Sequence, residues 1–217
     1  MAIPQQFRKT TVSLVKTGVK RLITSKRISM YSFFDFNRLR LFGWDHSEMP
    51  LLKFRRDLDV KKLSREDLCM LARGEGRFAE QARLYYKKRG IDSAYGIYMN
   101  GDLIHTSWVY TSAEYSLEPF CRLDLKKGEV EIVNCFTVEK CRGLGIYPYM
   151  IQFLSRLQFE KGIERVYMMA DHKNHASQRG IIKAGLKPLG QVTYLRVPAA
   201  SSKSIYYQRN EDNENRN

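Results

Sequence analysis

The sequence has few of the residues from which proteins build metal centres and disulfide frameworks. It holds four cysteines and four histidines among 217 residues. No two of the cysteines (Cys69, Cys121, Cys135 and Cys141) have C-x-x-C spacing. His172 and His175 stand three positions apart, but no third ligand is obvious near them in the chain. We therefore expect neither a metal site nor a disulfide framework, which fits a reducing cytoplasm.

Long apolar runs are missing as well. No stretch of about 18 consecutive apolar residues occurs, which is the length needed to span a membrane. The N-terminus has neither the unbroken apolar segment nor the small-residue cleavage site of a signal peptide. We expect a cytoplasmic protein without a membrane span. Hydrophobic residues make up 43% of the chain, enough for one sizeable domain with a core.

Acidic residues are scarce relative to basic ones, and the net charge is +14. Residues 1–62 contain fourteen Lys and Arg against five Asp and Glu. Such an excess favours an anionic partner, such as a nucleic acid, an acidic lipid or a phosphorylated substrate. A basic surface that contacts only solvent is a safer interpretation than a specific anionic partner. Nucleic acid is the least favoured partner, because no known nucleic-acid-binding motif accompanies the charge.

Residues 5–26 predict a basic amphipathic helix. Val12, Val15, Val19 and Leu22 fall at spacings of three and four, with Lys and Arg around the stripe. Such a helix either packs on its own domain, which is commoner, or contacts a membrane surface or an acidic acyl carrier protein. Residues 31–44 are aromatic, and we expect them to be irregular and to line a pocket or cover the core.

The remainder predicts a regular succession of elements. Ser64 to Asp67 resembles a capping box that starts a helix, and residues 76–88 predict a second helix. Asn100-Gly101 is a hairpin turn between two strands. Further strands are expected at 129–138, 165–170 and 191–197, with helices at 145–161 and 174–184, and a frayed tail from 201. This order predicts an α/β fold, α+β in some classifications, with a mixed sheet.

The segment from Arg142 to Gly145 joins a strand to a helix. Its two glycines, Gly143 and Gly145, flank Leu144 and can take positive φ angles at little cost. The unpaired N–H groups at the start of the helix, together with its dipole, then favour an anion, and Arg142 would add a charged contact. Alone this pattern is ambiguous, because Gly-x-Gly turns before helices also serve packing.

Two motifs together resemble the GNAT acyltransferase superfamily over residues 93–197. The loop pattern Arg/Gln-x-x-Gly-x-Gly/Ala matches Arg142 and Gly145, with Tyr147 where a small residue is usual. The second pattern runs from an asparagine to a Gly-Phe pair about ten residues on. It matches Asn174, Ser177, Lys183, Gly185 and Leu186.

The resemblance implies a GNAT fold, with a mixed, mostly antiparallel sheet, flanking helices and two splayed parallel strands at the cofactor cleft. Together with the composition of the two ends, it divides the chain into three regions: a basic, mostly helical acceptor-side region at 1–90, an acyl-CoA-binding core at 91–198 and a polar, flexible tail at 199–217. It implies no metal and acetyl-CoA, or another acyl-CoA, as cosubstrate. The implied cofactor-binding residues are Phe136, Thr137, Val138, Arg142, Gly143, Leu144, Gly145, Ile146, Tyr147, Asn174 and Ser177.

Three residues are candidates for the chemistry. The stretch from Glu131 resembles the strand that carries the glutamate base of GNAT histone acetyltransferases, although Glu131 could equally face solvent. The family's acidic tyrosine, seven positions after the asparagine, is replaced by Ile181. Tyr147 is a substitute acid by position, and Tyr149 a weaker one. Cys135 is either a further substitute, a nucleophile or a small core residue.

Three functions follow. The first is N-acetylation of a small primary amine by direct attack. The Arg-Gly-Leu-Gly-Ile-Tyr-Pro variant is similar to GNAT enzymes found among surface-polysaccharide genes, which implies an amino sugar acceptor. The second uses a long-chain acyl-CoA or an acyl carrier protein, met by the basic N-terminal helix at the membrane surface. The third is a degenerate fold that binds without catalysis, for which the loss of tyrosine at Ile181 is the main support.

Overall fold

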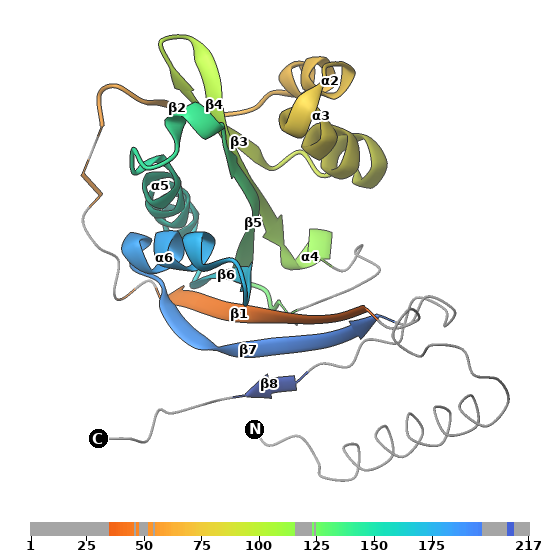
Figure 1. The fold of residues 1–217 in the computed structure, drawn as a ribbon, viewed down its shortest axis with the longest axis vertical. Helices are drawn as coiled ribbons and strands as arrows, with labels where there is room; N and C mark the ends of the chain where they lie inside the picture. The colour runs from red at the N-terminus through yellow and green to blue at the C-terminus, as the bar shows by residue number, and fades with distance from the viewer. Residues whose placement is uncertain are drawn as a thin grey trace, which may run out of the picture.

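The computed structural model describes residues 35–45, 47, 52–53, 55–115, 123, 125–196 and 208–210. Eight strands form one sheet in the order β2-β3-β4-β5-β6-β1-β7-β8, with helices on its two faces (Figure 1). Of the strand pairs in this described part, β5 with β6 is parallel and the others are antiparallel. The prediction of a mixed, mostly antiparallel sheet is confirmed.

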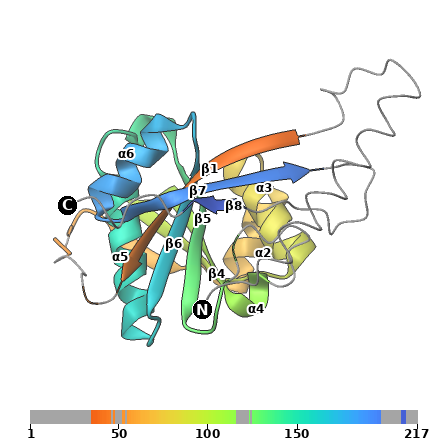
Figure 2. The same cartoon turned by 90° about the horizontal axis from the view of Figure 1, so that it is seen from below.

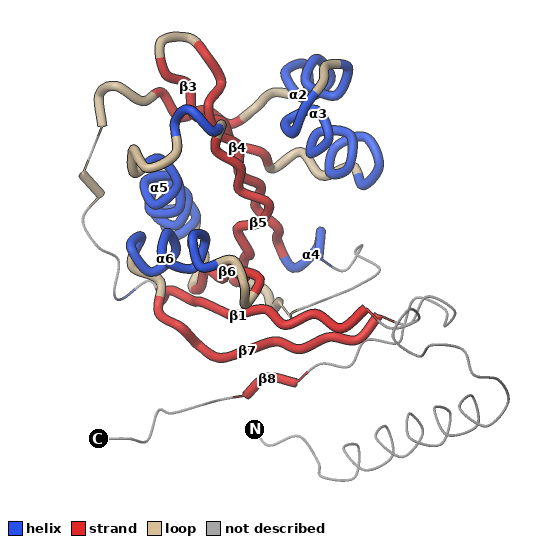
Figure 3. Tube along the Cα trace, viewed as in Figure 1, coloured by secondary structure: helices blue, strands red, loops and turns tan. Residues whose placement is uncertain are grey.

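Figure 3 distinguishes the helices from the strands of the described residues. The N-terminal half contains β1 (Asp35–Asp45), β2 (Asp59–Lys62), α2 (Arg65–Arg73), α3 (Gly76–Ala82), the π-helical turn η3 (Arg83–Lys88), β3 (Ala94–Met99), β4 (Asp102–Thr111) and α4 (Ser112–Tyr115). The C-terminal half contains β5 (Glu129–Thr137), the 3₁₀ turn η4 (Glu139–Cys141), α5 (Ile146–Glu160), β6 (Arg165–Asp171), α6 (His175–Ala184), β7 (Lys187–Arg196) and β8 (Gln208–Asn210).

Local sequence signals set several of these boundaries. Ser64 and Asp67 form the expected reciprocal capping box at the start of α2. Asn100 (φ 53°) and Gly101 (φ 85°) both take positive φ, as a two-residue hairpin turn requires. Gly185 (φ 111°) ends α6 in the left-handed region. The element order predicted from residue 93 onward is confirmed.

The expectation of an irregular aromatic segment at 31–44 is wrong from residue 35 onward. Those residues belong to β1, which pairs antiparallel with β6 on one edge and with β7 on the other. Leu41, Phe42 and Trp44 are all buried, because both faces of the sheet are covered here and the register with β7 shifts between Leu41 and Phe42. The alternation by which a strand is recognised is therefore limited to residues 38–41, where the arginines are exposed and the leucines buried, and it is lost from Leu41 to Trp44.

The described part of residues 1–90 contains β1 and β2 beside α2, α3 and η3. The predicted helix at 5–26 lies outside the described residues. In the tail, Gln208–Asn210 form β8 on β7, so the expectation of a frayed tail is wrong for these three residues. The rest of 199–217 also lies outside the described part.

The sheet separates two hydrophobic clusters. Figure 2 shows α5 and α6 on one side of the sheet and α2, α3 and α4 on the other. The cluster under α5 and α6 contains Val130 and Ile132 of β5, and the cluster on the α2–α3 side contains Val133. Successive β5 residues thus face opposite sides of the sheet, and β5 contributes side chains to both hydrophobic clusters.

Candidate acyl-CoA site

The parallel strands β5 and β6 separate shortly after they begin. Their pairing covers Glu129 to Glu131 on β5 and Arg165 to Tyr167 on β6. Beyond this point β5 pairs with β4 as far as Thr137, and β6 pairs with β1 as far as Asp171. The expected splay of the parallel strands is confirmed, and Glu131 lies at the vertex of the opening.

A β-bulge in β5 accompanies the separation. Trp108 of β4 is opposite Val133, whereas Thr106 is opposite Phe136, so β5 holds one extra residue. Asn134 takes a φ of 49°, and its carbonyl accepts a 2.6 Å hydrogen bond from Nε2 of Gln81 in α3. The Oε1 atom of Gln81 accepts from the Thr106 hydroxyl at 2.6 Å. One buried side chain from α3 thus holds β4 and the bulge together.

The glycine loop leads from the end of β5 into α5. Gly143 (φ 81°) and Gly145 (φ 74°) both take left-handed φ angles, and Gly145 is the N-cap of α5. A Cβ built on Gly143 would meet no atom within 4 Å, so the outer face of the loop is open. The first N–H groups of a helix have no partner within it. This geometry suits an anion bound by backbone amides.

Arg142 lies on the end of β5 rather than over the loop. Its Nε atom donates to the Thr137 carbonyl at 3.3 Å, and its guanidinium lies 5.9 Å from the Phe136 ring centroid. The amide of Val138 donates to the Ile104 carbonyl at 2.9 Å. The Val138 amide is therefore already paired, because the end of β5 stays paired with β4.

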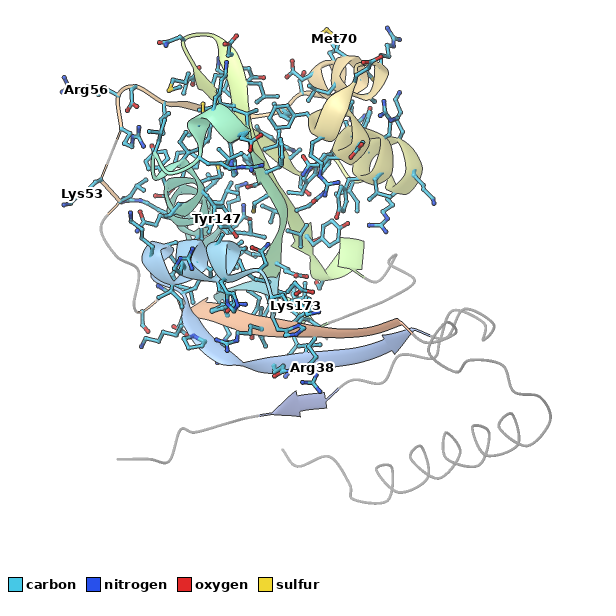
Figure 4. The ribbon with its side chains drawn as sticks, viewed as in Figure 1. Arg38, Lys53, Arg56, Met70, Tyr147 and Lys173 are labelled. Atoms are coloured by element: carbon cyan, nitrogen blue, oxygen red, sulfur yellow. The ribbon has the colours of Figure 1, made fainter. Side chains whose placement is uncertain are left out.

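The second motif starts α6. The Oδ1 atom of Asn174 accepts the Ser177 amide at 3.1 Å, so Asn174 is the N-cap of this helix. The hydroxyls of Ser177 and Tyr147 are 3.0 Å apart. One edge of the Tyr147 ring lies against Gly180 of α6, where an added Cβ would come within 2.5 Å of the ring. Figure 4 shows Tyr147 beside α6.

Burial determines the protonation state of Tyr147. Loss of solvent raises the pKa of its hydroxyl, and the neighbouring Cys135 raises it further. Ile181, which occupies the family's usual tyrosine position, is fully buried in the core. Tyr147 is thus a neutral phenol between α5 and α6 that can donate a hydrogen bond.

His105 was not identified from the sequence. It is fully buried on β4, with Nδ1 2.7 Å from the Thr137 hydroxyl and Nε2 2.8 Å from the Ser107 hydroxyl. Burial lowers its pKa to about 3, so the ring is neutral at neutral pH. Its ring centroid lies 6.3 Å from that of Tyr147. The available signal was the polar run from His105 to Ser107 inside an otherwise apolar strand.

Glu131 and Cys135 have different environments. Glu131 is 2% exposed and lies opposite Tyr110 and Tyr167 on the neighbouring strands, which excludes the solvent-facing interpretation. By alternation it shares the α2–α3 side with Val133, across the sheet from Tyr147. Burial raises the pKa of the Cys135 thiol to about 12. That thiol is protonated at neutral pH and is a poor nucleophile.

Three further observations concern the described residues. Within the described ranges, no group of three or more His, Cys, Asp or Glu side chains is placed to hold a metal ion. No helix in this part of the chain has the length and apolar character needed to cross a membrane. A cavity of about 430 Å³ lies at the other end of α5 from the loop, lined by residues that include Asp45, Phe159, Gly162 and Arg165.

Comparison with known proteins finds similarity in structure alone. No protein-family model matches the sequence, and no curated protein matches it. Solved structures do match. A GNAT-family acetyltransferase from Colwellia psychrerythraea superposes with a TM-score of 0.53 at 16% identity, over 75% of this chain and 55% of that one. A conserved protein of unknown function from Staphylococcus epidermidis gives 0.53 at 15% identity, over 91% and 82%.

A third match is a GCN5-related glucosamine N-acetyltransferase region of a fungal multi-domain β-N-acetylglucosaminidase. It has a TM-score of 0.55 at 11% identity and covers 88% of this chain and 23% of that one. The chain spans a little over half of the first solved structures that it matches, for instance 55% and 56% of two of them. These likenesses confirm the GNAT fold.

Proposed function

We propose that this chain is an N-acetyltransferase that moves the acetyl group of acetyl-CoA to a primary amine of a small acceptor. One observation carries the proposal: the parallel strands part at Glu131, beside a helix that starts on two glycines with positive φ. A cleft that ends at an amide-lined helix start suits a long, thin ligand with a diphosphate at one end. Acyl-CoA has that form.

The residues present fit such a ligand. The amides from Gly143 to Tyr147 would hold the diphosphate, and the open space above Gly143 leaves room for its oxygens. Arg142 would neutralise part of the charge from the end of β5. Pantetheine would follow Phe136 and Thr137, and the amide of Asn174 and the hydroxyl of Ser177 would bind it from α6. Tyr147, larger than the usual residue, narrows this path by its contact with Ser177.

In the proposed reaction the acceptor nitrogen attacks the thioester carbonyl carbon. The new C–N bond forms, and Glu131 takes the proton that the nitrogen loses. An N–H of the β5 bulge would stabilise the oxyanion. The C–S bond then breaks, and Tyr147 donates its proton to the departing sulfur. Because Glu131 and Tyr147 lie on opposite sides of the sheet, the base faces the acceptor side and the acid faces the cofactor.

An amino sugar is the acceptor class that we propose. The match to a glucosamine N-acetyltransferase region supports it, as does the loop variant from Arg142 to Pro148. The net charge of +14 suits a phosphorylated or nucleotide-linked form of that sugar.

A long-chain acyl-CoA is the alternative donor to acetyl-CoA. Single-turnover rates measured with acetyl-CoA and with long-chain acyl-CoA distinguish the two donors.

Calorimetric titration of the folded protein with acetyl-CoA tests the donor. We expect binding with a dissociation constant below the millimolar range, followed by release of free CoA thiol when an amino sugar is added. Absence of binding at millimolar acetyl-CoA contradicts the proposal. Binding without thiol release for any amine in a panel of amino sugars, polyamines and amino acids would instead support a non-catalytic binding module.

The Glu131→Gln variant tests the base. We expect kcat to fall about 10²- to 10⁴-fold, the usual contribution of a general base, with the affinity for acetyl-CoA unchanged. The control is Glu129→Gln, which makes the same charge change two residues earlier on β5 and should retain most of kcat. A Glu131→Gln enzyme with wild-type kcat at all pH values would remove Glu131 from the mechanism.

A further inference from the structure

The glycine loop is contacted by an arginine from a distant part of the chain. Arg55, which precedes β2, lies 89 positions before Leu144 and donates from Nη1 to the Leu144 carbonyl at 2.7 Å. The same Nη1 atom lies 3.9 Å from the Cβ position built on Gly145. The Arg55 guanidinium therefore lies against the start of α5, where the amides of the loop converge.

The orientation of this guanidinium is fixed from its other side. Both Asp57 carboxylate oxygens accept from Arg55, with Nε to Oδ1 at 3.1 Å and Nη2 to Oδ2 as the second bond. A guanidinium held by two parallel bonds keeps its plane and direction. Its side chain is 31% exposed, so it is supported by protein and still open to a ligand.

The position of Arg55 contrasts with that of Arg142. Arg142, the arginine of the sequence motif, donates to the Thr137 carbonyl and lies over the Phe136 ring at the end of β5. It is Arg55 that reaches the loop carbonyl itself. A bound diphosphate carries two negative charges, and one cation near each end of the loop would neutralise both.

We infer that Arg55 is a second phosphate-binding arginine, which contacts the diphosphate of the CoA donor at the start of α5. The inference rests on the proposed function and adds a residue to the same site. Asp57 has two effects in this arrangement: it orients Arg55, and it competes with the phosphate for the guanidinium. The donor site is then completed by a segment that precedes the glycine loop by almost ninety residues.

The test compares the affinities of variants for acetyl-CoA and for acetyl-dephospho-CoA, which lacks the 3′-phosphate. We expect Arg55→Ala to weaken both ligands by the same factor, about tenfold, as loss of one charged hydrogen bond allows. Arg56→Ala is the matched control: it removes the same charge from an exposed neighbour, which Figure 4 shows at the edge of the molecule, and should change the affinity less than twofold.

Arg55→Lys separates a charge contact from support of the loop. Lysine retains the positive charge but cannot make both parallel bonds to Asp57, so we expect it to recover part of the affinity that alanine loses and to keep the salt dependence of binding. An affinity of Arg55→Lys no better than that of Arg55→Ala, with an unchanged salt dependence in both, would show that Arg55 only supports the loop. A defect that vanishes with acetyl-dephospho-CoA would move the contact to the 3′-phosphate. Either result overturns the inference while wild-type binding still upholds the proposed function, and a wild-type protein that does not bind overturns both.

Discussion

Individual side chains between α5, α6 and β4 show what the motif residues do before any ligand binds. Tyr147 and Ser177, both expected at the cofactor, hydrogen-bond each other at 3.0 Å. Asn174 uses its side-chain oxygen to cap α6, which leaves its NH₂ group for a ligand. These motif residues therefore hold the starts of α5 and α6 together and cap α6, whatever they bind.

Tyr147→Phe is the substitution that tests the proposed acid. It removes the hydroxyl and keeps the ring that packs against Gly180. We expect kcat to fall about 10- to 100-fold with little change in the affinity for acetyl-CoA, because proton donation acts on the leaving thiolate. Tyr149→Phe is the control, since the Tyr149 hydroxyl is buried in the same helix without a hydrogen bond. Equal kcat for Tyr147→Phe and wild type would show that Tyr147 is not the acid and that the CoA thiolate leaves unprotonated.

His105 makes stability depend on pH. Its pKa is about 3 in the folded protein and near 6.5 when unfolded, so between these values the unfolded chain binds one more proton. Its contribution is complete above pH 6.5 and is lost as the pH falls toward 3. We expect this residue to lower the free energy of unfolding by about 1.4 kcal/mol per pH unit in that range.

Urea unfolding of wild type and His105→Asn from pH 4 to pH 7 measures this contribution. Asparagine keeps hydrogen-bonding atoms near Thr137 and Ser107 but does not titrate. We expect the free energy of unfolding of the variant to fall less steeply as the pH is lowered. The difference between the two slopes should correspond to nearly one proton. Parallel curves for the two proteins would mean that His105 titrates normally.

At the scale of elements, the bulge in β5 and the buried Gln81 amide from α3 form one unit. Gln81→Leu would leave the Asn134 carbonyl and the Thr106 hydroxyl without this partner, and buried polar groups that lose a bond cost about 1–3 kcal/mol each. We expect a loss of at least that size in the free energy of unfolding, and faster amide exchange at residues 134–137. Gln152→Leu is the control, since Gln152 bonds a helix-end carbonyl far from the bulge. Unchanged exchange at the bulge would show that Gln81 does not hold it.

Elements whose signals are local could be predicted from the sequence. The hairpin at Asn100-Gly101, the capping box at Ser64 and the ends of α5 and α6 depend on residues a few positions apart. β1 was not recognised, because its alternation is limited to residues 38–41 and is lost from Leu41 to Trp44, where both faces are buried. Gln81 and Arg55 could not be found either, since their partners lie 53 and 89 positions away and only the folded chain brings them together.

At the scale of the whole molecule, the sheet brings together strands that lie far apart in the sequence. β1 lies between β6 and β7. Residues 35–45, far from the motifs in the sequence, therefore form an interior strand of the sheet that contains β5 and β6. The helices α2 and α3 cover the face on which Glu131 lies, and α5 and α6 cover the face of the glycine loop. Under the proposed function, the face that carries Glu131 is the acceptor side and the face covered by α5 and α6 is the donor side of the same sheet.

The central claim is that acyl-CoA binds in this opening and on the loop at its end. Amide chemical shifts of isotope-labelled protein, followed while acetyl-CoA is added, test it most directly. We predict that the largest shifts occur at the amides of Gly143 to Tyr147 and of Phe136 and Thr137. Largest shifts around Phe159, Gly162 and Arg165, which line the cavity at the far end of α5, or no shifts at millimolar acetyl-CoA, would contradict the account.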